Sequence, residues 1–196
     1  MKTYENRASG PGPRRSHPWS TSTEDLGHRY YDFRARPELI PAVLEDFRPW
    51  EAYVAVRSFY DLLAWINGPA SPFESNDCAF AGPEANVDRG FRKRLQCSGR
   101  LGLLFRDLRA NTSDRAMIRL IEGIHVRLRA IDPDFAWGAV GTTRLRVDYL
   151  ELPEGGAAGS QVLLSFWAWG DDEPEVFENL ARVIVALREA LESPFR

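Results

Sequence analysis

The residues that could do chemistry lie mostly in one short segment. Glu74, Asp77 and Cys78 fall within the run from Phe73 to Phe80. A cysteine beside a carboxylate could act as a nucleophile if a histidine lies close to it in the fold. Ser, Asn and Asp side chains also bond to nearby backbone amides and hold turns without catalysis. We favour this structural interpretation, and a small hydrolase or transferase stays as the alternative.

The sequence predicts neither a metal site nor a cofactor. The chain has three histidines and two cysteines, and none of them is spaced as zinc ligands are. It also lacks a Walker-type phosphate loop, a dinucleotide-binding glycine motif and a Gly-x-Ser-x-Gly elbow. His125 lies on the flank of an apolar helical stripe, so we expect a partly buried histidine with a local hydrogen bond.

Composition indicates an ordinary globular protein. The chain has 196 residues, of which 44% are apolar and 27% charged. Residues 1–23 are rich in Pro and Gly and are predicted to be a flexible tail before a single domain at residues 24–196. No run approaches the roughly 18 apolar residues that a membrane helix needs, and no apolar stretch follows the N-terminal charges.

The use of basic and sulfur residues predicts a source and a compartment. Lys2 and Lys93 are the only lysines among 25 basic residues, which is typical of a GC-rich bacterial genome. Two cysteines are too few for a disulfide scaffold, so we expect a cytoplasmic protein. The sequence leaves open whether Cys78 and Cys97 pair, and it makes no prediction of the oligomeric state.

Apolar spacing predicts four helices. A short one is expected at residues 37–47 and a second from Ser58 to Ile66, with residues 50–56 either a strand or part of a helix. A third is expected from Asp114 to Ile131, with N-caps offered by the residues just before it. The last begins at a cap formed by Asp172 and runs to about residue 191.

Alternating apolar residues predict the strands. Residues 91–97 and 100–108 are expected to form a hairpin around a Ser98-Gly99 turn, and residues 139–152 a second hairpin with 161–169. The segment from Gly68 to Gly90, with its prolines, is predicted to be a long loop. The order indicates an α+β two-layer sandwich, with a mostly antiparallel sheet of two ββα units and the long helices on one face.

The strand at residues 161–169 predicts a binding surface. Its aliphatic side chains alternate with a second set that contains Trp167 and Trp169. If the aliphatic side chains of the segment 139–152 point to the helix-covered face, as those of 161–169 do, then Arg144 and Arg146 lie beside the tryptophans on the other face. Trp and Arg are enriched at binding hot spots. The alternative is that the N-terminal helices cover this face.

The charge distribution adds a hypothesis about the partner. The last helix begins with an acidic cluster, which consists of Asp171, Asp172, Glu173, Glu175 and Glu178. We therefore expect a non-enzymatic binding protein that docks a macromolecule, most simply a protein, through the Trp/Arg face or the segment from Phe73 to Phe80. A toxin-neutralising immunity protein is one specific version.

A weaker alternative is nucleic-acid binding. Residues 89–131 carry 11 basic and 3 acidic residues, although the whole chain has a net charge of −3. The region from Arg89 to Arg119 also contains Phe91, and a basic groove with an aromatic side chain suits phosphates and stacked bases.

Overall fold

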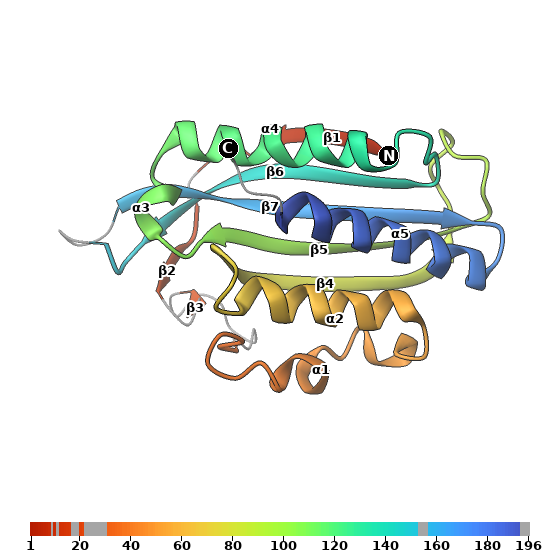
Figure 1. The fold of residues 1–196 in the computed structure, drawn as a ribbon, viewed down its shortest axis with the longest axis horizontal. Coiled ribbons are helices and arrows are strands. Elements are labelled where there is room, and N and C mark those ends of the chain that lie inside the picture. The colour runs from red at the N-terminus through yellow and green to blue at the C-terminus, as the bar shows by residue number, and fades with distance from the viewer. Residues whose placement is uncertain (9, 11, 17–19, 22–30, 153–156, 193–196) are drawn as a thin grey trace.

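The fold is a mixed seven-stranded sheet with helices packed on it (Figure 1). The computed structural model describes the chain except for residues 9, 11, 17–19, 22–30, 153–156 and 193–196. The strand order is β3-β2-β6-β7-β5-β4, and β1 also pairs with β6. The strands are β1 (Lys2–Arg7), β2 (Arg14–Ser16), β3 (Ser20–Thr21), β4 (Phe73–Ala85), β5 (Leu95–Phe105), β6 (Gly138–Tyr149) and β7 (Ala157–Gly170).

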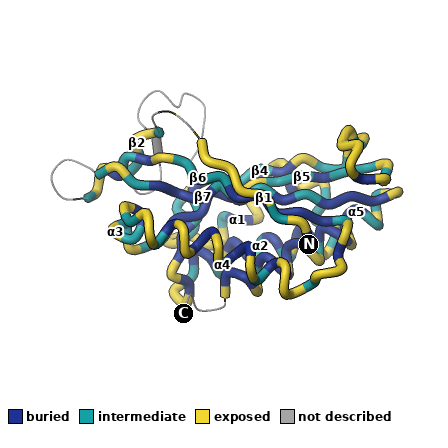
Figure 2. The backbone as a smooth tube through the Cα atoms, turned by 90° about the horizontal axis from the view of Figure 1, so that it is seen from above, coloured by how far each residue is buried: buried dark blue, intermediate teal, exposed yellow. Residues whose placement is uncertain are grey.

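The long helices form a second layer on one side of the sheet (Figure 2). In Figure 1, α5 crosses the middle of the sheet, with α4 on the β6 side and α2 on the β4 side. This arrangement confirms the predicted α+β class and the packing of helices on the sheet; the two ββα units stay a prediction. The helices are α1 (Leu39–Val43), α2 (Val54–Asn67), α3 (Leu108–Asn111), α4 (Asp114–Ile131) and α5 (Glu173–Glu192), with a 3-10 turn at Arg48–Trp50.

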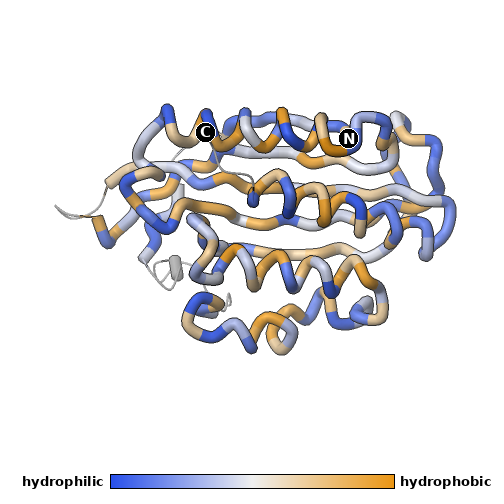
Figure 3. The backbone as a smooth tube through the Cα atoms, in the orientation of Figure 1, coloured by the Kyte–Doolittle hydropathy of each residue, from blue (hydrophilic) through white to orange (hydrophobic). Residues whose placement is uncertain are grey.

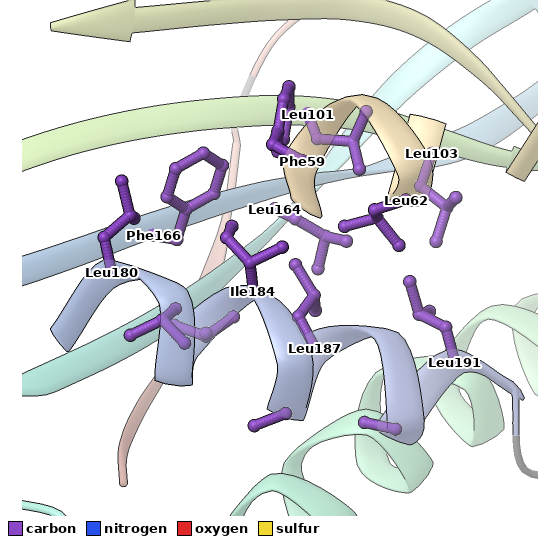
Figure 4. Close-up of a cluster of buried hydrophobic side chains, with 14 of the residues drawn as sticks. Phe59, Leu62, Leu101, Leu103, Leu164, Phe166, Leu180, Ile184, Leu187 and Leu191 are labelled. Carbon is purple, nitrogen blue, oxygen red and sulfur yellow. The ribbon is translucent and has the colours of Figure 1, made fainter. Parts of the chain in front are cut away.

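The main core lies between α5 and the middle strands. Leu180, Ile184 and Leu187 on α5 are buried against Leu164 and Phe166 of β7 (Figure 4). Apolar residues recur along each long helix and colour its tube in repeated orange bands (Figure 3). Burying a leucine or isoleucine side chain stabilises the fold by about 1.5–3 kcal/mol. This apolar layer fixes α5 over β7.

The expected caps of the two long C-terminal helices are confirmed. The Ser113 hydroxyl accepts a hydrogen bond from the Ala116 amide at the start of α4. The Asp172 carboxylate accepts one from the Glu175 amide at the start of α5. Both caps satisfy amides that the first helical turn leaves unpaired. The sequence therefore predicted α4 at its observed bounds and the start of α5 to within a residue.

The predicted loop from Gly68 to Gly90 is wrong, because most of it is strand β4. The register of β4 against β5 shifts between Ser75 and Asp77 and again between Ala81 and Glu84. Each shift interrupts the alternation that marks a strand in sequence. The predicted Ser98-Gly99 turn is also wrong, since both residues lie inside the continuous strand β5.

The predicted flexible tail contains three strands, the last of which is the short β3 at Ser20–Thr21. Lys2–Arg7 forms β1, which runs parallel to β6, and Arg14–Ser16 forms β2, which pairs with the end of the same strand. Residues 9, 11, 17–19, 22 and 23 of that tail lie outside the described residues. The N-terminal helices also differ in length, because α1 is shorter than expected and α2 begins four residues before Ser58.

Asn111 ties α3 to the sheet where β5 and β7 diverge. Its side chain is fully buried, accepts a hydrogen bond from the Phe105 amide and donates one to the Phe105 carbonyl, each at 2.8 Å. The pairing of β5 with β7 ends at Leu103 and Val162. The amide of Asn111 therefore replaces the missing strand partner of Phe105.

We expect Asn111→Ala to lower the free energy of unfolding by about 2 kcal/mol or more, because it leaves the Phe105 amide and carbonyl without their partner. Arg109→Ala, on an exposed residue of the same helix, is the matched control and should change the free energy by less than about 0.5 kcal/mol. Urea unfolding followed by circular dichroism measures both. Equal stability of the two variants would contradict this role of Asn111.

His125 joins α4 to β6, so the expected hydrogen bond is present but reaches another element instead of staying local. The residue is buried, and its Nε2 lies 3.0 Å from the Thr142 hydroxyl. Burial lowers the pKa of His125 below its usual value of 6.5, and Arg129 on its own helix also lowers it. Glu5 of β1 opposes these effects and raises the pKa of His125. The neutral imidazole is therefore the form that the fold favours.

Because the pKa of His125 is lower in the folded than in the unfolded chain, the unfolded chain takes up the proton first as the pH falls. We expect the stability to decrease from about pH 7 to 5, and to decrease less in His125→Gln. Urea unfolding of both proteins across this range measures the difference. An equal or steeper pH dependence in the variant would disprove the effect.

Candidate interaction surface

The sheet has a second side, opposite α2, α4 and α5, which we call the far face. Strand register assigns residues to it. Val140 and Phe166 pair across β6 and β7 and belong to the helix-side core. The alternate residues of these strands, including Gly141 and Trp167, therefore point to the far face.

Two rows of mostly small side chains cross the centre of the far face. Each row contains one residue from β1, β6, β7, β5 and β4 in that order, paired in register. The first row is Tyr4, Gly141, Ser165, Arg100 and Ala79; the second is Lys2, Ala139, Trp167, Ser98 and Ala81. Small side chains leave the aromatic rings room to lie along the sheet.

Trp167 and Tyr4 are the aromatic residues of this centre. Trp167 is half-buried, and a Cβ added to Gly141 would lie only 3.2 Å from its indole ring. The indole therefore lies against the backbone of β6 at the position that pairs with Tyr4. Tyr4 is 46% exposed. An ion pair between Arg100 and Asp77, at 3.2 Å, adds a charged group to the same face.

Trp169 shares this face with Trp167 but is covered. The turn before β5 places Phe91 on the indole, with ring centroids 3.7 Å apart and planes nearly parallel. The Lys2 ammonium lies 4.0 Å from the centre of the Phe91 ring. Trp169 is only 3% exposed. It is therefore a core residue at one end of the far face, and Trp167 carries the exposed aromatic surface.

The predicted acidic residues follow Trp169 and have local partners. Lys93 bonds to Asp171 at 2.8 Å and to Glu175 at 2.5 Å, and these bonds lower the pKa of both carboxyls. Asp172 caps α5, and Glu173 accepts a hydrogen bond from the Tyr53 hydroxyl. Asp171 and Asp172 nevertheless stay exposed at the surface.

The structure does not bring Arg144 and Arg146 together with the tryptophans. Arg144 pairs with Val162, which belongs to the helix-side core, so it points away from the far face. Arg146 pairs with Ser160 and shares that side. The assumption that the aliphatic residues of β6 share the helix-covered face is wrong, because Val147 and Tyr149 form a smaller core on the far face with Leu104.

Tyr4 was missed by the sequence analysis because it lies in the predicted tail. Thr3 and Tyr4 are residue types that favour strands, and this was the available local signal. The six residues of β1 pair with β6, more than 130 positions away. A parallel pairing over such a distance leaves no local pattern in the sequence.

Glu74, Asp77 and Cys78 do not converge on a reaction centre. Glu74 and Asp77 pair with far-face positions of β5, whereas Cys78 packs against the helix-side core. Burial, aided by Asp77, raises the pKa of the Cys78 thiol to about 12, which keeps it protonated. His125, the histidine that the structure describes, is on α4 and contacts β6, which is three strands from β4 in the sheet order. Cys78 and Cys97 are both free thiols.

The basic residues of the region from Arg89 to Arg119 are dispersed. Lys93 is engaged with Asp171 and Glu175, and Arg100 with Asp77. Arg106 donates to the carbonyls of Asn67, Gly68 and Phe73, so it holds α2 and β4 together. These contacts give three of the nine basic residues in this region a structural role.

Comparison of the chain with family models, curated proteins and solved structures gives no match. Within the part of the chain that the structure describes, no group of three or more His, Cys, Asp or Glu could hold a metal ion. None of the described helices combines the length and apolar character needed to cross a membrane.

The two tryptophans should respond differently to truncation. We expect Trp169→Ala to destabilise the protein by about 3–5 kcal/mol, because it opens a cavity beneath Phe91. Trp167→Ala should cost about half of that or less, since part of the ring already contacts solvent. Thermal unfolding measures both variants. A larger loss for Trp167→Ala would show that the far-face centre is part of the core.

Proposed function

We propose that the chain is a non-enzymatic binding protein that docks a protein partner on the centre of the far face. The observation that supports this most is the half-buried Trp167, which lies on the backbone of β6 at the position that pairs with the exposed Tyr4. Trp and Tyr offer a large contact area at low entropic cost and dominate many interfaces. The long helices lie on the other side and leave this area uncovered.

The composition of the far face favours a protein partner whose contact region is partly apolar and partly basic. The small residues around Trp167 form a flat platform that an aromatic or aliphatic side chain can approach. Asp171 and Asp172 lie exposed beyond the end of β7. Exposed carboxylates at the rim of an interface speed the encounter with a basic partner.

One specific version of the proposal is a toxin-neutralising immunity protein. Such a protein needs a rigid surface that occludes the active site of its target and needs no catalytic group of its own. The continuous β4-β5-β7-β6 sheet supplies that rigidity. The bacterial origin and cytoplasmic location expected from composition belong to this same proposal.

The test is affinity capture with the wild-type chain, Trp167→Ala and the control Val126→Ala as baits. Val126 is 60% exposed on α4, on the other side of the sheet. We expect one protein to bind the wild type and the control but not Trp167→Ala. The captured protein is then purified and its affinity measured by calorimetry, where Trp167→Ala should weaken binding by 2 kcal/mol or more, about 30-fold.

The immunity version has its own readout. Expression of the captured protein alone should stop bacterial growth, and co-expression of the wild-type chain should restore it, whereas Trp167→Ala should not. A captured protein that binds Trp167→Ala as tightly as the wild type would overturn the proposed surface. Binding of a purified partner without any effect on growth would retain the surface and remove the immunity version.

A further inference from the structure

Arg144 and Arg146 line a pocket on the helix side of the sheet, at the edge where β1 ends. Its volume is about 330 Å³. Arg7 also lines the pocket, because it pairs in register with Arg144 and therefore points to the same side. The remaining lining consists of small and hydroxyl-bearing residues and one carboxylate, which are Ala8, Gly10, Thr112, Asp114, Ala158, Gly159 and Ser160.

Arg144 is held in place before any ligand arrives. Its side chain is only 14% exposed. Its Nε donates to the Ser160 hydroxyl at 2.9 Å, and its terminal nitrogen donates to the Asp114 carboxylate. A guanidinium fixed in this way loses little further conformational freedom when it binds an anion.

The charges of the pocket do not balance. Arg7, Arg144 and Arg146 supply three positive charges, Asp114 is the one carboxylate among the lining residues, and Asp148 lies 3.8 Å from the Nε of the exposed Arg146. Arg7 and Arg144 are direct neighbours on adjacent strands, and like charges in that position destabilise a sheet. Arg144 lowers the pKa of the Asp114 carboxyl, and so does Arg7 to a lesser extent. Three guanidinium groups face two carboxylates, so one positive charge is in excess and leaves a place for an anion.

We propose that this pocket binds a phosphate monoester. Guanidinium groups bind phosphate with paired, charge-assisted hydrogen bonds. A phosphate monoester carries about −1.5 to −2 charges at pH 7, so it neutralises the excess charge and can compete with Asp148 for Arg146. The Ser160 hydroxyl, which accepts from Arg144, can donate its proton to a further phosphate oxygen, and the glycines and alanines leave room for the group attached to the phosphate.

This site is independent of the proposed protein-binding surface. Trp167 lies on the far face, whereas Arg144 and Arg146 of β6 and Arg7 of β1 point to the helix side. Trp167→Ala should therefore leave phosphate binding unchanged. Failure of one proposal does not imply failure of the other.

The probe is O-phosphoserine, titrated into the full chain by calorimetry at constant ionic strength, with serine as the blank. We expect phosphoserine to bind and serine not to bind. Arg7→Gln and Arg146→Gln should each weaken binding about tenfold, because each removes a charged hydrogen-bond donor. Both residues are exposed, so these variants should fold, which circular dichroism verifies.

Two further variants make the test specific. Asp114→Asn should strengthen phosphoserine binding, because it removes the carboxylate that competes for Arg144 while keeping an acceptor in place. Arg92→Gln, an exposed arginine outside the pocket, should have no effect. No binding of phosphoserine, weaker binding by Asp114→Asn, or an equal loss in Arg92→Gln would overturn the site.

A peptide that carries one phosphoserine distinguishes the two sources of the same chemistry. Binding of the peptide at least tenfold tighter than free phosphoserine would support a phosphorylated protein as the ligand. Equal or weaker binding of the peptide, with phosphoserine still bound, would support a small phosphate ester. In either case Arg7→Gln must weaken the binding; unchanged binding by this variant would rule out the site.

Discussion

The pairing of β6 with β7 is the constraint on which the other assignments depend. It extends over 12 consecutive residue pairs. Because side chains alternate along a strand, a slip of one residue would exchange the two faces of the sheet. The observed register places Trp167 beside Gly141 and Ala139 on one side, and Arg144 beside Ser160 and Asp114 on the other. A tryptophan surface and an arginine pocket on opposite sides are the direct result.

The helix layer then decides which parts of each side stay accessible. On the helix side, α5 packs on β7, and α4, which begins at Asp114, packs on β1 and β7. The arginine pocket lies just where α4 begins. On the far face, the core of Leu104, Val147 and Tyr149 covers one end, and Phe91 covers the other. The centre around Trp167 stays between them.

Local pattern predicted the elements that a local pattern can specify. The stripes of α4 and α5 have the helical period, and their caps are short polar side chains at the expected offsets. The hairpin of β6 and β7 alternates cleanly. β4 was missed because two register shifts and a polar run conceal its alternation. β1 was missed because its partner, β6, is distant in sequence.

The candidate site was predicted only in its residue types. Trp167 and the arginines were singled out by chemistry, but their faces depend on long-range register. Val147 and Tyr149 do lie on a core face, but it is the far face, which has a core of its own at that end. An aliphatic set therefore does not identify the helix side when a sheet buries residues on both faces. Trp169 shows the same limit, because a turn some 80 residues earlier in the chain covers it.

The arginine pocket differs from the buried polar residues elsewhere in the protein. Asn111 bonds to the backbone of Phe105, and Asn67 to the Leu63 carbonyl and the Ser75 amide. Such side chains hold adjacent elements together, and their hydrogen bonds serve the fold. The three arginines of the pocket instead bring like charges together, opposed by the carboxylates of Asp114 and Asp148. Local violations of the rules for stability are typical of functional sites, and here an added anion would both fill the pocket and relieve the repulsion.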